Sequence, residues 1–242
     1  MRTHSYLEQF ANLDLDRATR THIPEVVFAE NKSPHQTVEI TKRLLEKRRR
    51  AMLSRVPVET LTALETAFDA DTINWKRYAE GRTLILHHSD SHIPLSGGII
   101  GILSAGTSDI PIAEEAHALC QETGCVVHSS YDVGVAGLHR LFEPLQAMLS
   151  APVDAIIVVA GMDGALPSVV AGLVDVPIIG LPTSVGYGFG GAGIGALTNM
   201  LQTCAPGLAV VNIDNGIGAG AMASRIAIRA AAARAEVPIT ND

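Results

Sequence analysis

The strongest constraint on the fold is an alternation that begins near residue 99, where short apolar runs and helix-like stretches follow each other five times. The apolar runs span 99–103, 125–128, 155–160, 177–181 and 207–212; the helix-like stretches span about 111–123, 136–149, 165–174, 190–203 and 217–235. Strands that read as nearly continuous apolar runs are typical of a parallel sheet covered by helices on both faces. The sequence therefore predicts an α/β fold with a three-layer parallel sheet of about five strands.

Composition divides the chain into two regions near residue 90. Residues 1–90 carry 14 of the 18 Lys and Arg residues, whereas residues 91–242 carry 21 of the 22 glycines. In the first region, the apolar spacing of 37–54 and 58–70 predicts two amphipathic helices, and 17–34 reads as an extended segment or small strand. We therefore expect a smaller, mainly helical N-terminal region over 1–90, a linker over His87–Gly98, and a catalytic domain over 91–242.

Charge and hydropathy exclude several functions. Residues 91–242 contain 12 acidic residues but only four Arg and no Lys, which argues against a nucleic-acid surface. The polar N-terminus lacks the apolar run of a signal peptide, and no uncharged apolar stretch is long enough to span a membrane without glycine or proline breaks. We expect a cytoplasmic protein with no nucleic-acid or membrane partner. Phosphate recognition in the acidic region must rely on backbone amides, helix N-termini, its few arginines, or cations from the first region.

The predicted strand-to-helix turns hold the candidate functional residues, because ligands bind beyond the carboxyl ends of parallel strands. The first turn offers a sharp glycine followed by hydroxyls and a carboxylate, which suits either an N-cap or an anion site. The second turn places polar side chains before the one Arg found between Arg82 and Arg225, which suits either an internal salt bridge or an anion ligand. The candidates in these two turns are Gly106, Thr107, Ser108, Asp109, Tyr131, Asp132 and Arg140.

The later turns add a carboxylate and a flexible loop. Asp163 lies between two glycines at the start of a predicted helix, where a carboxylate can cap the helix or act as a general acid or base. The following turn holds six glycines within 186–195, which would let backbone amides approach a ligand. The candidates here are Gly161, Met162, Gly186 and Tyr187, with Asn215 in the polar segment after the last strand.

The three cysteines have no spacing typical of disulfides or zinc sites. Cys120 and Cys125 fall in a predicted helix and strand, where we expect packed core residues. Cys204 falls where a predicted helix gives way to a strand. A helix C-terminus disfavours the thiolate, so local chemistry alone favours a structural cysteine there over a nucleophile.

Several blocks of the chain, in order, resemble the LarB family of pyridinium-3,5-biscarboxylic acid mononucleotide synthases. The blocks are IPEVVFAENK in the first region, then AGTSDIPIAEEA, YDVGVAGLHRL, VVAGMDGALPSVVAGL, PTSVGYG and VVNIDNG. The catalytic half of this family is similar to the aminoimidazole ribonucleotide carboxylase domain. The resemblance implies a flavodoxin-like sheet and a homo-oligomer, expected as an octamer.

The resemblance also implies a reaction. The family adds CO₂, supplied as CO₂ or bicarbonate, to the pyridine ring of nicotinic acid adenine dinucleotide and hydrolyses its phosphoanhydride, releasing AMP. The family's nucleophilic cysteine falls at Cys204, and its acidic residue, commonly glutamate, falls at Asp163. The turn candidates given above fall in the substrate-binding motifs. No tightly bound cofactor and no metal ligand are implied, and Mg²⁺ is a candidate only for the hydrolysis step.

Two other functions stay open. One is an aminoimidazole ribonucleotide carboxylase or mutase, although those proteins lack such a first region and carry a Ser-Ala-His-Arg sequence where this chain reads SSYDVGVAG. The other is a non-catalytic nucleotide-binding regulator, which the presence of Cys204 and Asp163 disfavours.

Overall fold

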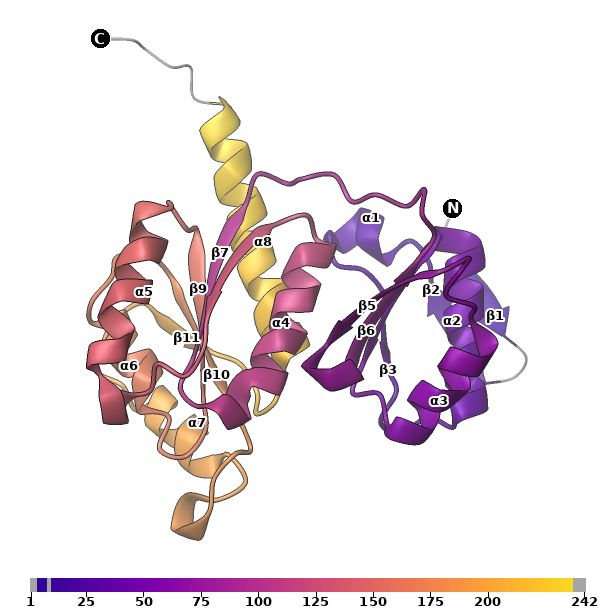
Figure 1. Cartoon of the computed structure of the whole chain (residues 1–242). Coiled ribbons are helices and arrows are strands. Elements are labelled where there is room, and N and C mark those ends of the chain that lie inside the picture. The colour runs from indigo at the N-terminus through magenta and orange to yellow at the C-terminus, as the bar shows by residue number, and fades with distance from the viewer. Residues whose placement is uncertain (1–3, 8–9, 237–242) are drawn as a thin grey trace. The chain divides into compact units, whose positions relative to one another are not determined.

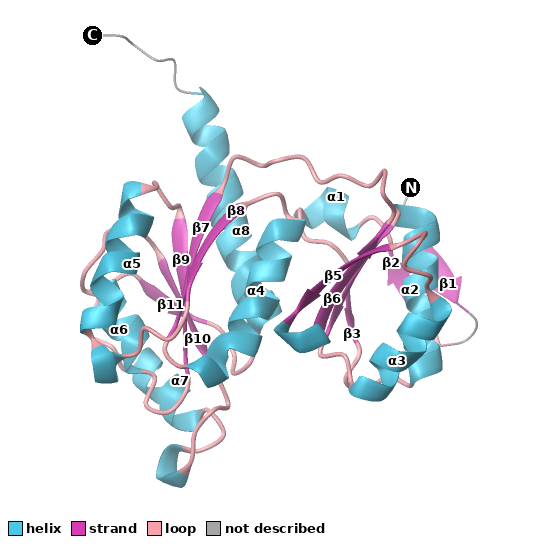
Figure 2. Cartoon of the chain, in the orientation of Figure 1, coloured by secondary structure: helices cyan, strands magenta, loops and turns pink. Residues whose placement is uncertain are grey.

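The computed structural model describes residues 4–7 and 10–236 and divides into two compact units, Met1–Ile93 and Pro94–Asp242. The boundary lies within the expected linker, where residues 88–98 contain neither helix nor strand. Figures 1 and 2 show the elements of each unit. None of the helices in the described residues combines the length and the apolar character needed to cross a membrane.

The N-terminal unit contains a four-stranded sheet in the order β3-β4-β6-β5 and a separate antiparallel pair, β1-β2. Strands β3 and β4 are parallel, whereas β6 is antiparallel to both β4 and β5. The elements are β1 (His4–Leu7), β2 (Ala11–Asp14), α1 (Arg17–Thr21), β3 (Val26–Phe28), α2 (Pro34–Arg48), β4 (Arg50–Ser54), α3 (Val58–Ala67), β5 (Asn74–Tyr78), η1 (Ala79–Gly81) and β6 (Thr83–His87).

Helix α2 shows how local sequence starts and stops an element in this unit. Ser33 and Gln36 form a reciprocal capping box, and Pro34 occupies the first turn, where its missing N–H leaves no donor unsatisfied. Arg49 ends the helix in a left-handed conformation with φ 61°. The buried faces of α2 and of strands β4 and β6 then pack into one core.

The N-terminal region, expected as mainly helical or mixed, is therefore mixed: it contains two sheets as well as the helices α1, α2 and α3. The segment 37–54 was predicted as one helix, but it splits at Arg49 into α2 and the buried strand β4. Strand β4 pairs with β3 on one side and β6 on the other, and these pairings depend on residues far away in the sequence. The helix predicted over 58–70 forms as α3, and β3 lies within the segment expected to be extended.

The C-terminal unit confirms the α/β prediction. Its five strands are all parallel, in the order β11-β10-β9-β7-β8. The elements are β7 (Ile99–Ser104), η2 (Thr107–Asp109), α4 (Ile110–Glu122), β8 (Val126–Ser130), η3 (Val135–Gly137), α5 (His139–Ser150), β9 (Ala155–Ala160), α6 (Ala165–Ala171), β10 (Ile178–Pro182), η4 (Gly188–Gly190), α7 (Ile194–Leu201), β11 (Leu208–Val210) and α8 (Gly216–Glu236).

Both faces of the three central strands, β7, β9 and β10, are buried, as the continuous apolar runs predicted, whereas the edge strands β8 and β11 are partly exposed. Successive residues of the central strand β9 point to opposite faces, so Ile157 packs in the core beneath α4 and α8 and Ile156 in the core beneath α5, α6 and α7. The C-terminal end of α8 is fixed by the ion pair between Arg234 and the buried carboxylate of Asp154. The layers hold the carboxyl ends of β7, β8, β9 and β10 at one edge.

Candidate active site

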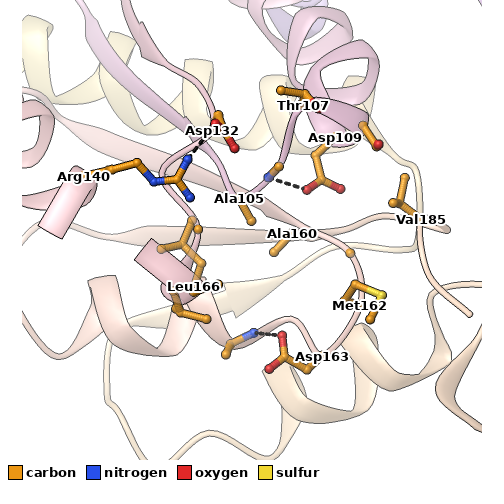
Figure 3. Close-up of a pocket in the computed structure, with 17 residues that line it drawn as sticks. Ala105, Thr107, Asp109, Asp132, Arg140, Ala160, Met162, Asp163, Leu166 and Val185 are labelled. Atoms are coloured by element: carbon orange, nitrogen blue, oxygen red, sulfur yellow. Dashed lines mark hydrogen bonds and ion pairs between the residues drawn. The ribbon is translucent and has the colours of Figure 1, made fainter. Parts of the chain in front are cut away.

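A cavity of about 410 Å³ lies at the carboxyl edge of the parallel sheet. Its walls come from the turns after β7, β8, β9 and β10, which Figure 3 shows converging on one space. Open α/β sheets bind ligands at this edge. The predicted residues that line the cavity are Gly106, Thr107, Ser108, Asp109, Asp132, Arg140, Gly161, Met162 and Asp163.

Asp109 holds three of these turns together. One carboxylate oxygen accepts a hydrogen bond from the Gly106 amide at 2.9 Å, and the other accepts one from the Thr183 hydroxyl at 2.6 Å. Asp109 is 4% exposed, and this burial raises the pKa of its carboxyl group, whereas its bonds with Thr183 and with the backbones of Gly106 and Gly161 lower it. The Asp109 side chain makes no capping hydrogen bond to α4, so its hydrogen bonds connect the turns instead.

Arg140 is the one cationic side chain among the described residues that line the cavity. Its guanidinium donates to the Asp132 carboxylate at 2.6 Å, as Figure 3 shows. Both side chains are well exposed, so the pair contributes about 0–1 kcal/mol to stability. A guanidinium has five N–H donors, and a single carboxylate does not occupy all of them. The two sequence interpretations of Arg140, salt bridge and anion ligand, are therefore compatible.

The Asp163 turn is shaped by close backbone contacts. The Met162 amide donates to the Val185 carbonyl at 2.7 Å, and a Cβ on Gly161 would lie 2.3 Å from the same oxygen. Met162 itself adopts φ 51°, which is rare for a residue with a side chain. One Asp163 carboxylate oxygen accepts from the Ala165 amide at 3.3 Å, but the N-cap position of α6 is Gly164 and no side chain caps the helix. The exposed Asp163 carboxylate lines the cavity, where it is placed to act on a ligand.

A contact from α7 supports the same turn. The Asn199 side chain donates to the backbone carbonyl of Asp163 at 2.7 Å. A Cβ on Gly164 would lie 2.7 Å from the Cα of Ala196, so α7 packs directly against the residue after Asp163. Neither Asn199 nor Thr183 was predicted, because each acts through a contact with a distant turn. The position of Thr183, two residues after the predicted strand 177–181, was the one available signal.

Five predicted residues lie outside the cavity lining. Tyr131 points to α4, where its hydroxyl donates to Glu114; burial, and then this bond, raises the pKa of Tyr131. Asn215 accepts from the Gly218 amide at 2.8 Å and so caps the start of α8. Gly186 and Tyr187 belong to the loop that follows the lining residue Val185.

Cys204 is the fifth of these residues. Helix α7 ends at Leu201, so the thiol lies three residues beyond the helix, in the segment that returns to the start of β11. Cys204 is exposed, whereas Cys120 and Cys125 are buried as predicted. Five residues of chain limit the Cα of Cys204 to within about 18 Å of the Cα of Asn199, which contacts the Asp163 turn. The thiol does not line the cavity.

The described residues contain no group of three or more His, Cys, Asp or Glu side chains arranged to hold a metal ion. The cavity carboxylates of Asp109, Asp132 and Asp163 are spread over three turns, and both oxygens of Asp109 are engaged within the protein. The described residues therefore do not form an all-protein metal cage, whereas Mg²⁺ normally binds through one or two carboxylates together with substrate phosphates.

Comparison with known proteins identifies the family. Residues 5–88 match the family described as LarB/PurE-like N-terminal domain, and residues 99–237 match the family described as AIR carboxylase. The chain belongs to the LarB family. An uncharacterized protein of Methanocaldococcus jannaschii is 43% identical to this LarB-family chain over 222 residues, which cover 91% of the chain and 85% of that protein.

The mutases match little more than half of this LarB-family chain. An N5-carboxyaminoimidazole ribonucleotide mutase of Methanocaldococcus jannaschii is 33% identical over 131 residues, covering 53% of this chain and 78% of the mutase. A probable enzyme of the same name from Methanothermobacter thermautotrophicus is also 33% identical, over 52% of this chain and 36% of its own length. These matches indicate a carboxylase-type enzyme.

Proposed function

We propose that the protein carboxylates the pyridinium ring of nicotinic acid adenine dinucleotide and hydrolyses the phosphoanhydride, giving pyridinium-3,5-biscarboxylic acid mononucleotide and AMP. The product would enter nickel-pincer nucleotide biosynthesis. The observation that carries the proposal is the two-domain architecture, because the LarB-type N-terminal domain accompanies the carboxylase domain in one chain. The mutases match little more than half of the chain.

The composition of the cavity supports an anionic nucleotide as ligand. Arg140 can pair with a phosphate or carboxylate, and the hydroxyls of Thr107 and Ser108 can donate to phosphate oxygens. Asp109 fixes the turn that carries these hydroxyls. The cavity is large enough for the pyridine mononucleotide half of the substrate.

The chemistry requires a nucleophile because an electron-poor pyridinium ring does not attack CO₂. In the proposed route, the Cys204 thiolate adds to the ring, forming a C–S bond and a neutral dihydropyridine. This enamine forms the new C–C bond to CO₂ through its carbon β to nitrogen. Asp163, acting as base, then takes the proton from that carbon, and the C–S bond breaks to release thiolate and restore the aromatic ring.

The proposed hydrolytic step consumes one water molecule and no other co-reactant. A water molecule adds to one phosphorus, the bridging P–O bond breaks, and AMP leaves. No described side chain is assigned as the base for this water.

The exposed position of Cys204 makes the assembly part of the proposal. We propose a homo-oligomer, expected as an octamer, in which the thiol reaches a cavity of its own or of a neighbouring copy. Mixing Cys204→Ser subunits with Asp163→Asn subunits after dissociation distinguishes the two arrangements. Recovered activity in the mixture means that one copy supplies the thiol and another the carboxylate, and no recovery means that both act within one copy.

The test of the function is incubation of the purified protein with nicotinic acid adenine dinucleotide and ¹³C-bicarbonate, followed by mass spectrometry. The expected products are AMP and a mononucleotide that carries the label on its ring. Because two relatives are mutases of carboxyaminoimidazole ribonucleotide, that substrate is tested in parallel. Its turnover, without turnover of the dinucleotide, would replace the proposal with the mutase function.

A further inference from the structure

The loop between β10 and α7 exposes two aromatic rings next to the cavity. Val185 lines the cavity, and Tyr187 and Phe189 follow it at alternate positions. Tyr187 is 81% exposed and Phe189 is fully exposed. Figure 1 shows this loop extending from the carboxyl edge of the sheet, beside α7. The chain has only five Phe and four Tyr, so two exposed rings on one short loop are an unusual concentration.

The size of the cavity leaves part of the proposed substrate outside it. Pockets for drug-sized ligands have volumes of about 300–1,000 Å³, and this cavity, at about 410 Å³, is near the lower end of that range. A pyridine–adenine dinucleotide has two ring systems, two riboses and two phosphates. The cavity provides one cation and a set of polar groups that suit the pyridine half. We therefore expect the adenosine half to extend past the rim.

The loop places its aromatic rings within reach of that second half. An extended chain spans at most about 3.6 Å per residue, so the Cα of Phe189 lies within about 14 Å of the Cα of Val185. Gly188, between the two rings, has φ 75° and open space around it, so the ring positions can adjust to a ligand. Aromatic side chains stack on nucleobases with little dependence on base identity.

We propose that Tyr187 and Phe189 form the adenine-binding part of the site, with the base stacked on one or both rings. The proposal rests on the proposed function, because it assigns a place to the adenylate half of that substrate. It accounts for two exposed rings beside a cavity that holds one nucleotide.

The experiment is calorimetric titration of AMP, and separately of nicotinic acid mononucleotide, into the full-length wild type and the variants Phe189→Ala and Tyr187→Ala. Phe142→Ala is the matched control, because Phe142 is 52% exposed on α5 and does not line the cavity. We expect at least one loop variant to bind AMP roughly tenfold more weakly, with unchanged affinity for the mononucleotide. Phe142→Ala should bind both ligands as the wild type does.

Three results would overturn the assignment. They are unchanged AMP affinity in the double variant Tyr187→Ala/Phe189→Ala, equal weakening of both ligands, and a change of assembly mass by light scattering without a change in AMP affinity. The last result would assign the rings to a contact between copies. Product formation by the wild type is measured separately, so a protein that binds AMP through this loop but forms no carboxylated product would refute the proposed function alone.

Discussion

Replacing Thr183 by valine tests the role of the buried Asp109 carboxylate. Valine has nearly the shape of threonine, so the change removes the 2.6 Å hydrogen bond to Asp109 while leaving the packing volume almost unchanged. Thr183 is fully buried, so water does not replace the lost hydroxyl freely. A hydrogen bond to a charged group contributes about 1.5–3 kcal/mol, and we expect a loss of this size in the free energy of unfolding of the C-terminal unit at pH 7.

The loss should depend on pH in a defined direction. Burial raises the folded-state pKa of Asp109 above its unfolded value, so ionisation of this group weakens folding as the pH rises through the folded pKa. The Thr183 hydroxyl opposes this effect because it favours the carboxylate. Without the hydroxyl the pKa rises further, so the destabilisation is largest at neutral pH. It shrinks as the pH falls through the raised pKa, where Asp109 becomes neutral.

Urea unfolding followed by far-ultraviolet circular dichroism at pH 7 and at pH 4.5 measures this difference. The single tryptophan, Trp75, lies in β5 of the N-terminal unit, so its fluorescence should report an unchanged transition. Thr198→Val, at an exposed position of α7, is the control and should change stability by less than about 0.5 kcal/mol. An equal loss at both pH values would refute the reasoning, because it would mean that the hydroxyl does not act on the ionised carboxylate.

Three further outcomes are expected. Arg140→Met should raise the KM for the dinucleotide by roughly ten- to a hundredfold with little change in stability, and an unchanged KM would remove Arg140 from anion binding. Cys204→Ser should keep fold and assembly but lose ring carboxylation, whereas Cys120→Ser should only reduce thermal stability; an active Cys204→Ser enzyme excludes covalent catalysis. Deleting residues 1–90 should weaken dinucleotide binding, measured by calorimetry on a truncated protein shown to be folded, and equal binding would mean that Arg140 and backbone amides suffice.

The C-terminal fold was predictable because burial on both sides of a parallel strand leaves a clear local mark. The run 155–160 coincides with β9, and each of the other four predicted strands overlaps an observed one. The N-terminal sheet was not predictable in the same way. Strand β4 continues directly from a helical pattern, and the sequence alone does not show that Arg49 adopts φ 61° and ends the helix there.

The residues of the candidate site were likewise predictable where local sequence places them, and not where a contact between distant residues does. Turn residues such as Ser108 and Asp163 were found because their position follows from the order of strand and helix. The bond from Thr183 to Asp109 joins residues 74 positions apart, and no local pattern indicates it. Cys204 was selected through the family resemblance alone. The thiol is exposed between α7 and β11, and the mixing experiment tests which copy's cavity it acts in.

The strand order β11-β10-β9-β7-β8 has a consequence for how such enzymes diversify. The chain moves outward from β7 to β8 and then crosses back to β9, so the turns after neighbouring strands β7 and β9 diverge and leave room between them. The sheet beneath that gap is held by its buried layers, whereas the lining residues Thr107, Ser108 and Arg140 are exposed. Substitutions at these three positions can therefore change which ligand is accepted while the scaffold stays intact. Such a separation allows similar sequences to occur both in a LarB-family chain and in mutases named for an imidazole ribonucleotide.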